Sequence, residues 1–115
     1  MAKVRFVEQG IEAEVPVGTS ILQAAKSAHA PEGDACGGVC ACSTCHVYVE
    51  QGEALLSEAE EAEEDILDKA FDVRMNSRLG CQARIRAQGL VQVRISKESL
   101  EAFYNEHPEV PRPAL

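Results

Sequence analysis

The sequence predicts an α+β domain in which one helix packs across a mixed sheet. Three observations lead to this prediction. The chain opens with two runs of alternating apolar and polar residues, which is typical of two paired strands. Two later stretches have the apolar spacing of a helix, and each is followed by a further strand pattern. The resulting order, strand, strand, helix, strand, helix, strand, strand, has short local connections and is typical of α+β domains.

The first three elements follow one another closely. Residues 3–17, KVRFVEQGIEAEVPV, predict a hairpin, because a glycine lies between two alternating runs. Pro16 has no amide hydrogen to donate, so we expect the second strand at an edge of the sheet. Residues 19–29 predict a helix that begins with Ser20 and Gln23 in the spacing of a capping box.

The next elements include a short strand and a longer helix. Residues 46–50, HVYVE, predict the strand. Residues 56–71 predict the helix, in which Ser57 and Glu60 have the spacing of a second capping box. One face of this helix carries an apolar stripe that we expect to be buried, made of Ala59, Ala62, Ile66, Leu67, Ala70 and Phe71.

The C-terminal third predicts two more strands and an extension. Residues 77–83 are expected to form a loop, and residues 84–96 predict two short strand runs around a Gln-Gly turn. Residues 97–115 begin as a short helix and end in a proline-rich tail. We therefore divide the chain into a main domain, 1–96, and an extension, 97–115.

Composition limits the kinds of protein that this chain can be. Its 115 residues are 45% apolar, without tryptophan, so the core must consist mainly of Val, Ile, Leu and Ala. No apolar run approaches the ~20 residues of a membrane helix, and the N-terminus lacks the plan of a signal peptide. These features predict a cytoplasmic protein that does not enter a membrane.

The negative charge is concentrated in one segment. The net charge is −8, and residues 50–68 hold nine of the nineteen acids and none of the eleven bases. Such a surface repels nucleic acid and anionic membranes but attracts a basic protein surface. We expect a protein partner.

Four cysteines fall within the stretch CGGVCACSTCH, and a fifth is distant. Cys36, Cys42 and Cys45 have the spacing C-x5-C-x2-C, and Cys81 lies further along the chain. Plant-type 2Fe–2S ferredoxins have a similar pattern, with one residue fewer in the first gap. Cys40 is separated from Cys42 by one residue, and in a tight loop the two could hardly ligate one centre together. A structural zinc site and simple buried thiols remain as alternatives.

The neighbours of these cysteines suit a cluster that contains sulfide. Gly37 and Gly38 let the backbone come close and direct amide groups at sulfur, and Ser43 and Thr44 can donate hydroxyl hydrogen bonds. His46 could suggest a Rieske centre. With four cysteines present, we expect His46 to orient the loop through a hydrogen bond instead.

The stretches ACGGVCACSTCHVYVE and SRLGCQ resemble the adrenodoxin and putidaredoxin family of 2Fe–2S ferredoxins, and EEDILDKA resembles the acidic helix of that family. The resemblance extends over about residues 2–96. It implies a β-grasp fold and one 2Fe–2S cluster held by Cys36, Cys42, Cys45 and Cys81, with Cys40 not a ligand. It also implies that an acidic helix docks on basic partners, which here gives Glu61, Glu63, Glu64, Asp65 and Asp68 as docking candidates.

The predicted function is one-electron transfer rather than catalysis, because no residue set predicts a nucleophile with a base. The resemblance implies electron supply by an NAD(P)H-dependent flavoprotein reductase. It implies delivery to a cytochrome P450-type monooxygenase or to the iron–sulfur cluster assembly machinery, with a ring-hydroxylating oxygenase as a third acceptor. We expect a monomer. The alternatives are a cluster-based redox sensor in which Cys40 reacts, and a zinc-stapled interaction module.

Overall fold

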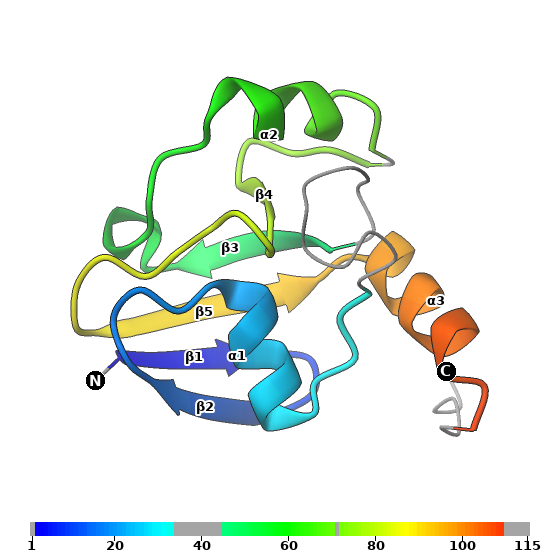
Figure 1. Cartoon of the computed structure of the whole chain (residues 1–115), viewed down its shortest axis with the longest axis horizontal. Helices are drawn as coiled ribbons and strands as arrows, with labels where there is room; N and C mark the ends of the chain where they lie inside the picture. Colours follow the sequence, from blue (N-terminus) through cyan, green and yellow to red (C-terminus); the bar gives the residue numbers. More distant parts are fainter. Residues whose placement is uncertain (1, 34–44, 71, 110–115) are drawn as a thin grey trace.

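A five-stranded mixed sheet with strand order β2-β1-β5-β3-β4 forms the centre of the computed structural model, which describes residues 2–33, 45–70 and 72–109 (Figure 1). Strands β1 and β5 are parallel, and the other neighbouring pairs are antiparallel. The predicted mixed sheet is therefore confirmed. The strands are β1 (Ala2–Phe6), β2 (Ile11–Val15), β3 (His46–Gln51), β4 (Ser77–Leu79) and β5 (Leu90–Ile95).

The predicted hairpin is formed by β1 and β2. Alternate residues of β1 are buried, and its exposed face pairs Lys3 with Glu14 and Arg5 with Glu12 across the two strands. Opposite charges in such cross-strand pairs stabilise the register. Pro16 directly follows β2, which is an edge strand as expected.

Within the described part of the chain, three α-helices accompany the sheet: α1 (Ile21–Ala28), α2 (Glu61–Leu67) and α3 (Lys97–Glu106). A short 3₁₀ helix, η1 (Glu53–Leu55), follows β3. The capping box predicted for α1 is present, since Ser20 Oγ accepts from the Gln23 amide and Gln23 Oε1 accepts from the Ser20 amide. Helix α1 buries one face in a core made of Ala2, Val4, Phe6, Ile21, Ala24, Val47, Val49, Ile85, Val91, Val93 and Ile95, among others.

Helix α2 differs from its prediction in length and in its buried face. It begins at Glu61, and no side chain caps it, so the capping box expected at Ser57 is wrong. The Ser57 hydroxyl instead accepts from the Arg84 amide at 3.0 Å. Leu67 is buried as expected, but Ala62 is exposed and Glu63 takes the buried position one turn before Leu67. Phe71 lies outside the described residues.

The segment between α2 and β5 also differs from the prediction. The expected loop over 77–83 contains β4, which pairs antiparallel with β3. The strand expected just before the Gln-Gly turn is absent from the described structure, where Ser20–Arg84 and Leu56–Ile85 form only isolated bridges. This part of the chain joins the start of α1 to the end of η1 and does not extend the sheet.

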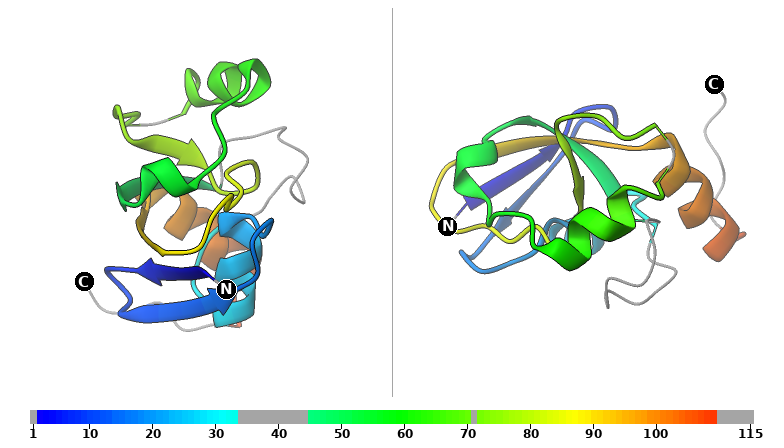
Figure 2. Two further views of the ribbon diagram at one scale, coloured as in Figure 1. Left: turned by 90° about the vertical axis from the view of Figure 1, so that its left-hand side faces the viewer. Right: turned by 90° about the horizontal axis from the view of Figure 1, so that it is seen from above.

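The C-terminal extension begins with the expected helix, α3, which lies against β3. Leu100 packs on the core, and Ser99 is fully buried. Figure 2 shows that α2 lies beside the β4 edge of the sheet, at the far side from the β1–β2 hairpin. No helix within 2–33, 45–70 and 72–109 is long and apolar enough to cross a membrane.

Candidate metal centre

Two of the predicted ligands, Cys45 and Cys81, are buried beside each other. Cys45 directly precedes β3, and Cys81 follows β4 after one glycine. The β3–β4 ladder pairs His46 with Leu79, and the Gly80 amide donates to the Cys45 carbonyl at 2.9 Å. The ladder therefore fixes both cysteines from opposite strands, with exposed fractions of 1% and 4%.

Apolar side chains from three elements enclose this pair of thiols. They come from α1, α2 and β4 and are Leu22, Ile66, Leu67 and Leu79. The Leu22 amide donates to the Gly80 carbonyl at 2.9 Å, so α1 is fastened directly to the turn that carries Cys81. This small cluster excludes water from the sulfur atoms.

The chemistry of the pair favours binding of a metal. The hydrogen bond between the Cys45 and Cys81 side chains, together with burial, raises the pKa of the Cys45 thiol far above its ordinary value. Two buried thiolates can therefore exist side by side only if a cation compensates their charge. The Gln82 side-chain amide donates to Cys81 Sγ at 3.4 Å. Soft sulfur donors with a directed N–H group fit an iron–sulfur cluster.

Glu32 belongs to the same region, although no pattern in the sequence indicated it. Its carboxyl group is buried against Gly80, and a Cβ at that glycine would collide with it. The negative charge of Glu32 also contributes to the raised pKa of Cys45. Any larger residue at position 80 would require the Glu32 side chain to move away from the backbone that leads to Cys81.

The other predicted centre residues lie outside the described residues. They are Cys36, Gly37, Gly38, Cys40, Cys42, Ser43 and Thr44. Within the described ranges no further His, Cys, Asp or Glu completes a three-membered metal group with Cys45 and Cys81. The assignment of the four ligands stays a prediction.

His46 makes a buried hydrogen bond with the start of β4, whereas the cysteine-bearing segment that it is expected to orient lies outside the described residues, so that role stays a prediction. The ring is fully buried, its Nε2 lies 2.8 Å from Ser77 Oγ, and its edge packs on Tyr48 at 4.8 Å between ring centroids. Burial lowers the pKa of His46, so the ring is neutral near pH 7. Ser77 also accepts from the Arg74 amide at 2.8 Å, which holds the loop before β4.

Glu63 is the docking candidate whose position the structure corrects. It is 2% exposed, and its carboxylate accepts from Arg78 Nε at 2.6 Å and Nη2 at 3.0 Å. The Leu79 amide donates to the same carboxylate at 3.0 Å. A buried carboxylate with three donors cannot meet a partner, so Glu63 is a structural residue.

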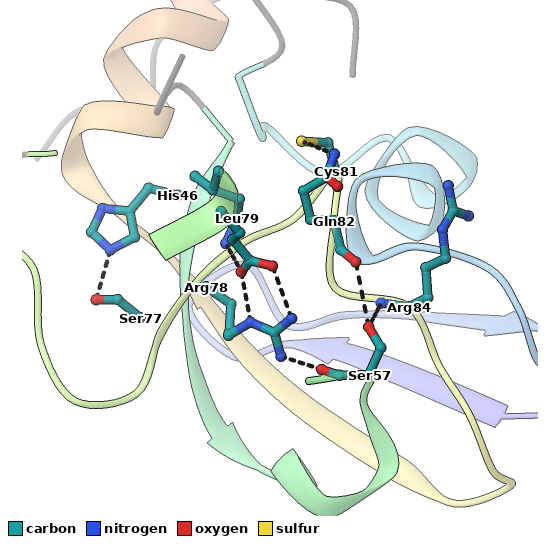
Figure 3. A network of polar contacts seen from close by, with 9 residues as sticks. His46, Ser57, Ser77, Arg78, Leu79, Cys81, Gln82 and Arg84 are labelled. Atoms are coloured by element: carbon teal, nitrogen blue, oxygen red, sulfur yellow. Dashed lines mark hydrogen bonds and ion pairs between the residues drawn. The ribbon is translucent and has the colours of Figure 1, made fainter. Parts of the chain in front are cut away.

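Arg78 extends this network to the residues before α2. Its Nη1 donates to the Ser57 carbonyl at 2.6 Å, and Ser57 Oγ in turn contacts the Gln82 carbonyl and the Arg84 amide (Figure 3). The segment that carries Cys81 is thus attached to Ser57, which precedes α2, and through Arg78 to Glu63 within α2. The position of Glu63 on the same face as Leu67 was the available signal for its burial.

The remaining docking candidates face solvent. They are Glu61, Glu64, Asp65 and Asp68, which we call the acidic face of α2. Because Glu63 and Leu67 hold the opposite side of the helix, these four carboxylates have a fixed direction relative to β4.

Residues 5–86 match the family of 2Fe–2S iron–sulfur cluster binding domains. A 2Fe–2S ferredoxin of Haemophilus influenzae is 41% identical over 95 residues, which cover 83% of each chain. The chain belongs to the 2Fe–2S ferredoxins. This ferredoxin binds one 2Fe–2S cluster and is an electron carrier rather than an enzyme, as predicted.

Solved structures agree with this family and with its β-grasp fold. The ISC-like 2Fe–2S ferredoxin FdxB of Pseudomonas putida has a TM-score of 0.76 and 43% identity, covering 84% of this chain and 94% of that one. Putidaredoxin in its covalent complex with putidaredoxin reductase has a TM-score of 0.70 and 34% identity, covering 82% and 97%. The ferredoxin is therefore of the adrenodoxin and putidaredoxin type that its motifs resemble.

Proposed function

We propose that this ferredoxin accepts one electron from an NAD(P)H-dependent flavoprotein reductase and passes it to the iron–sulfur cluster assembly machinery. The observation that carries this proposal is the acidic face of α2, fixed by Glu63 and Arg78 beside the strand that leads to Cys81. A partner bound at α2 lies near the segment of the chain that carries a cluster ligand.

The proposed ligands are Cys36, Cys42, Cys45 and Cys81. The neighbours Gly37, Gly38, Ser43 and Thr44 are proposed to donate hydrogen bonds to the cluster. When bound, the cluster supplies a one-electron redox centre. The described residues contribute two buried sulfur atoms, an amide donor from Gln82 and an apolar wall.

The reductase is proposed as the donor for two reasons. Putidaredoxin, which is similar over most of this chain, forms a complex with a reductase. The acidic face of α2 also supplies the charge that attracts a basic protein surface and accelerates association. An electron carrier needs contacts that form quickly and release readily.

The assembly machinery is proposed as acceptor ahead of a cytochrome P450. This chain has a higher TM-score to the ISC-like ferredoxin, 0.76, than to the reductase-bound putidaredoxin, 0.70, and its identity is also higher. A P450 remains the second acceptor, and we propose that the ferredoxin works as a cytoplasmic monomer.

The proposal is tested by supplying the reduced ferredoxin to each acceptor in turn. A reconstituted assembly system should form clusters on its scaffold only when the ferredoxin and its reductase are both present. A P450 with its own substrate should turn over much more slowly with the same ferredoxin. Faster transfer to the P450 would reverse the order of the two acceptors, and no reduction by any flavoprotein reductase would reject the donor.

A further inference from the structure

The first turn of α3 holds the chain on both sides of the cysteine-bearing segment. Ser99 Oγ accepts a hydrogen bond from the Gly33 amide at 2.8 Å, across 66 residues of sequence. The Ser96 amide donates to the His46 carbonyl at 3.1 Å. Gly33 is the last residue described before segment 34–44, and His46 is the second residue described after it.

The two serines of this turn are buried and hydrogen-bonded to the backbone. Ser96 and Ser99 have exposed fractions of 2% and 0%. Ser96 Oγ caps the helix by accepting from the Ser99 amide at 3.1 Å, and the Leu100 amide donates to the Ser96 carbonyl at 2.9 Å. Leu100 packs on the main core, so the turn is anchored to the body of the domain.

The views of the ribbon agree with this arrangement. Figure 1 places the start of α3 beside both the chain that leaves α1 and the beginning of β3. Two parts of the chain that are distant in sequence from α3 therefore meet at its N-terminal turn. The family match ends at residue 86, so this turn lies beyond the matched domain.

We propose that residues 96–100, which we call the α3 clamp, fasten both ends of the cysteine-bearing segment and so control how firmly the ferredoxin retains its cluster. Local opening of part of a protein happens far more often than global unfolding, and a bound metal centre is lost when its surroundings open. Binding of the metal and ordering of the chain around it are one coupled equilibrium. The hydrogen bonds that fasten Gly33 and His46 therefore oppose local opening at these two described residues.

Ser99 is the residue through which this clamp can be tested. Replacing it by alanine leaves the Gly33 amide buried without its acceptor, which favours opening at that end of the segment. Ser99→Ala in the full-length, cluster-loaded ferredoxin should release iron to a chelator about tenfold faster than the unchanged protein, as expected for one lost buried hydrogen bond. The release of iron is measured as the loss of visible absorbance in the absence of oxygen.

Ser20→Ala is the matched control. Ser20 is also a buried serine whose Oγ accepts a backbone amide hydrogen bond, but its donor is Gln23 within α1. Both substitutions should lower the melting temperature by similar amounts, because both remove one buried acceptor. Only Ser99→Ala should accelerate iron release beyond what its melting temperature explains. Equal acceleration by both variants would overturn the clamp.

Hydrogen exchange keeps the proposal testable if Ser99→Ala does not accumulate. In the unchanged ferredoxin, the Gly33 amide should exchange slowly and at a rate similar to that of the Ser96 amide, since one turn holds both. Rapid exchange at Gly33 together with slow exchange at Ser96 would show that the clamp does not hold the N-terminal end of the segment. In Ser99→Ala, where it folds, exchange at Gly33 should rise while exchange in β1 stays unchanged.

Discussion

Glu63 and Arg78 form a buried, bidentate ion pair that joins α2 to β4, with nitrogen–oxygen distances of 2.6 and 3.0 Å. The pair has consequences at both of its ends. At one end it turns the remaining acids of α2 toward solvent. At the other it fixes the strand that leads through Gly80 to Cys81. The same contact therefore orients the surface proposed for docking and supports the metal centre.

Breaking this pair should destabilise the ferredoxin strongly. Glu63→Gln leaves the Arg78 guanidinium buried without a compensating charge, which costs about 3 kcal/mol or more. The melting temperature of the cluster-loaded protein should fall by roughly 10 °C or more, as expected for a domain of this size. Glu61→Gln, on the exposed side of the same helix, should change it by very little.

A double substitution separates the charge from the packing. Glu63→Leu with Arg78→Met removes both charges and replaces them with apolar groups. The loss of stability should be smaller than the sum of the two single losses, because neither variant side chain leaves an unpaired charge. Strictly additive losses would show that the two side chains do not depend on each other.

The cysteines should differ sharply in their importance. Cys36→Ala, Cys42→Ala, Cys45→Ala and Cys81→Ala should each lose the visible spectrum of the cluster, and Cys40→Ser should keep it. For Cys45 and Cys81 the reason lies in the structure, where the two thiols are in contact and enclosed. Iron analysis of each purified variant provides the check. A Cys40→Ser protein without iron would mean that the predicted ligand set is wrong.

Gly80 should not tolerate a larger side chain. Its Cα faces the carboxyl group of Glu32, whose Cδ would lie 2.9 Å from an added Cβ. The colliding atoms are the end of the Glu32 side chain, which would have to move within its buried site, and such overpacking costs about 1–3 kcal/mol. Gly80→Ala should be purified with reduced cluster content. Shortening the opposing side chain in Gly80→Ala with Glu32→Ala should restore part of it, and no recovery would point to a cause other than this collision.

Local patterns in the sequence predicted the first half of the fold well. The hairpin, the capping box of α1 and the strand after the cysteines all depend on residues that are close in sequence. Strand β4 was missed because its three residues are too few to show alternation, and only pairing with β3 defines them. The helix start predicted at Ser57 was wrong because the Ser57 hydroxyl group forms hydrogen bonds with the backbone of Gln82 and Arg84, which are distant in sequence.

The sequence predicted the chemistry of the metal centre but not the buried residues that surround it and hold it in place. The spacing of the cysteines and the family resemblance pointed to a 2Fe–2S cluster, which the comparisons confirm. Neither the burial of Glu32 beside Gly80 nor the role of Glu63 could be predicted from charge alone. An acid in an acidic run is normally exposed, and the arginine that buries Glu63 comes from another element.

The proposed entry of electrons through the acidic face of α2 is tested most directly by the rate of reduction by the reductase at several salt concentrations. Asp65→Asn with Asp68→Asn should slow reduction about tenfold at low ionic strength, with a weaker dependence on salt. Glu12→Gln with Glu14→Gln removes the same charge from β2, at the opposite edge of the sheet, and should change the rate little. Equal slowing by both pairs, or a rate that ignores salt, would contradict the account.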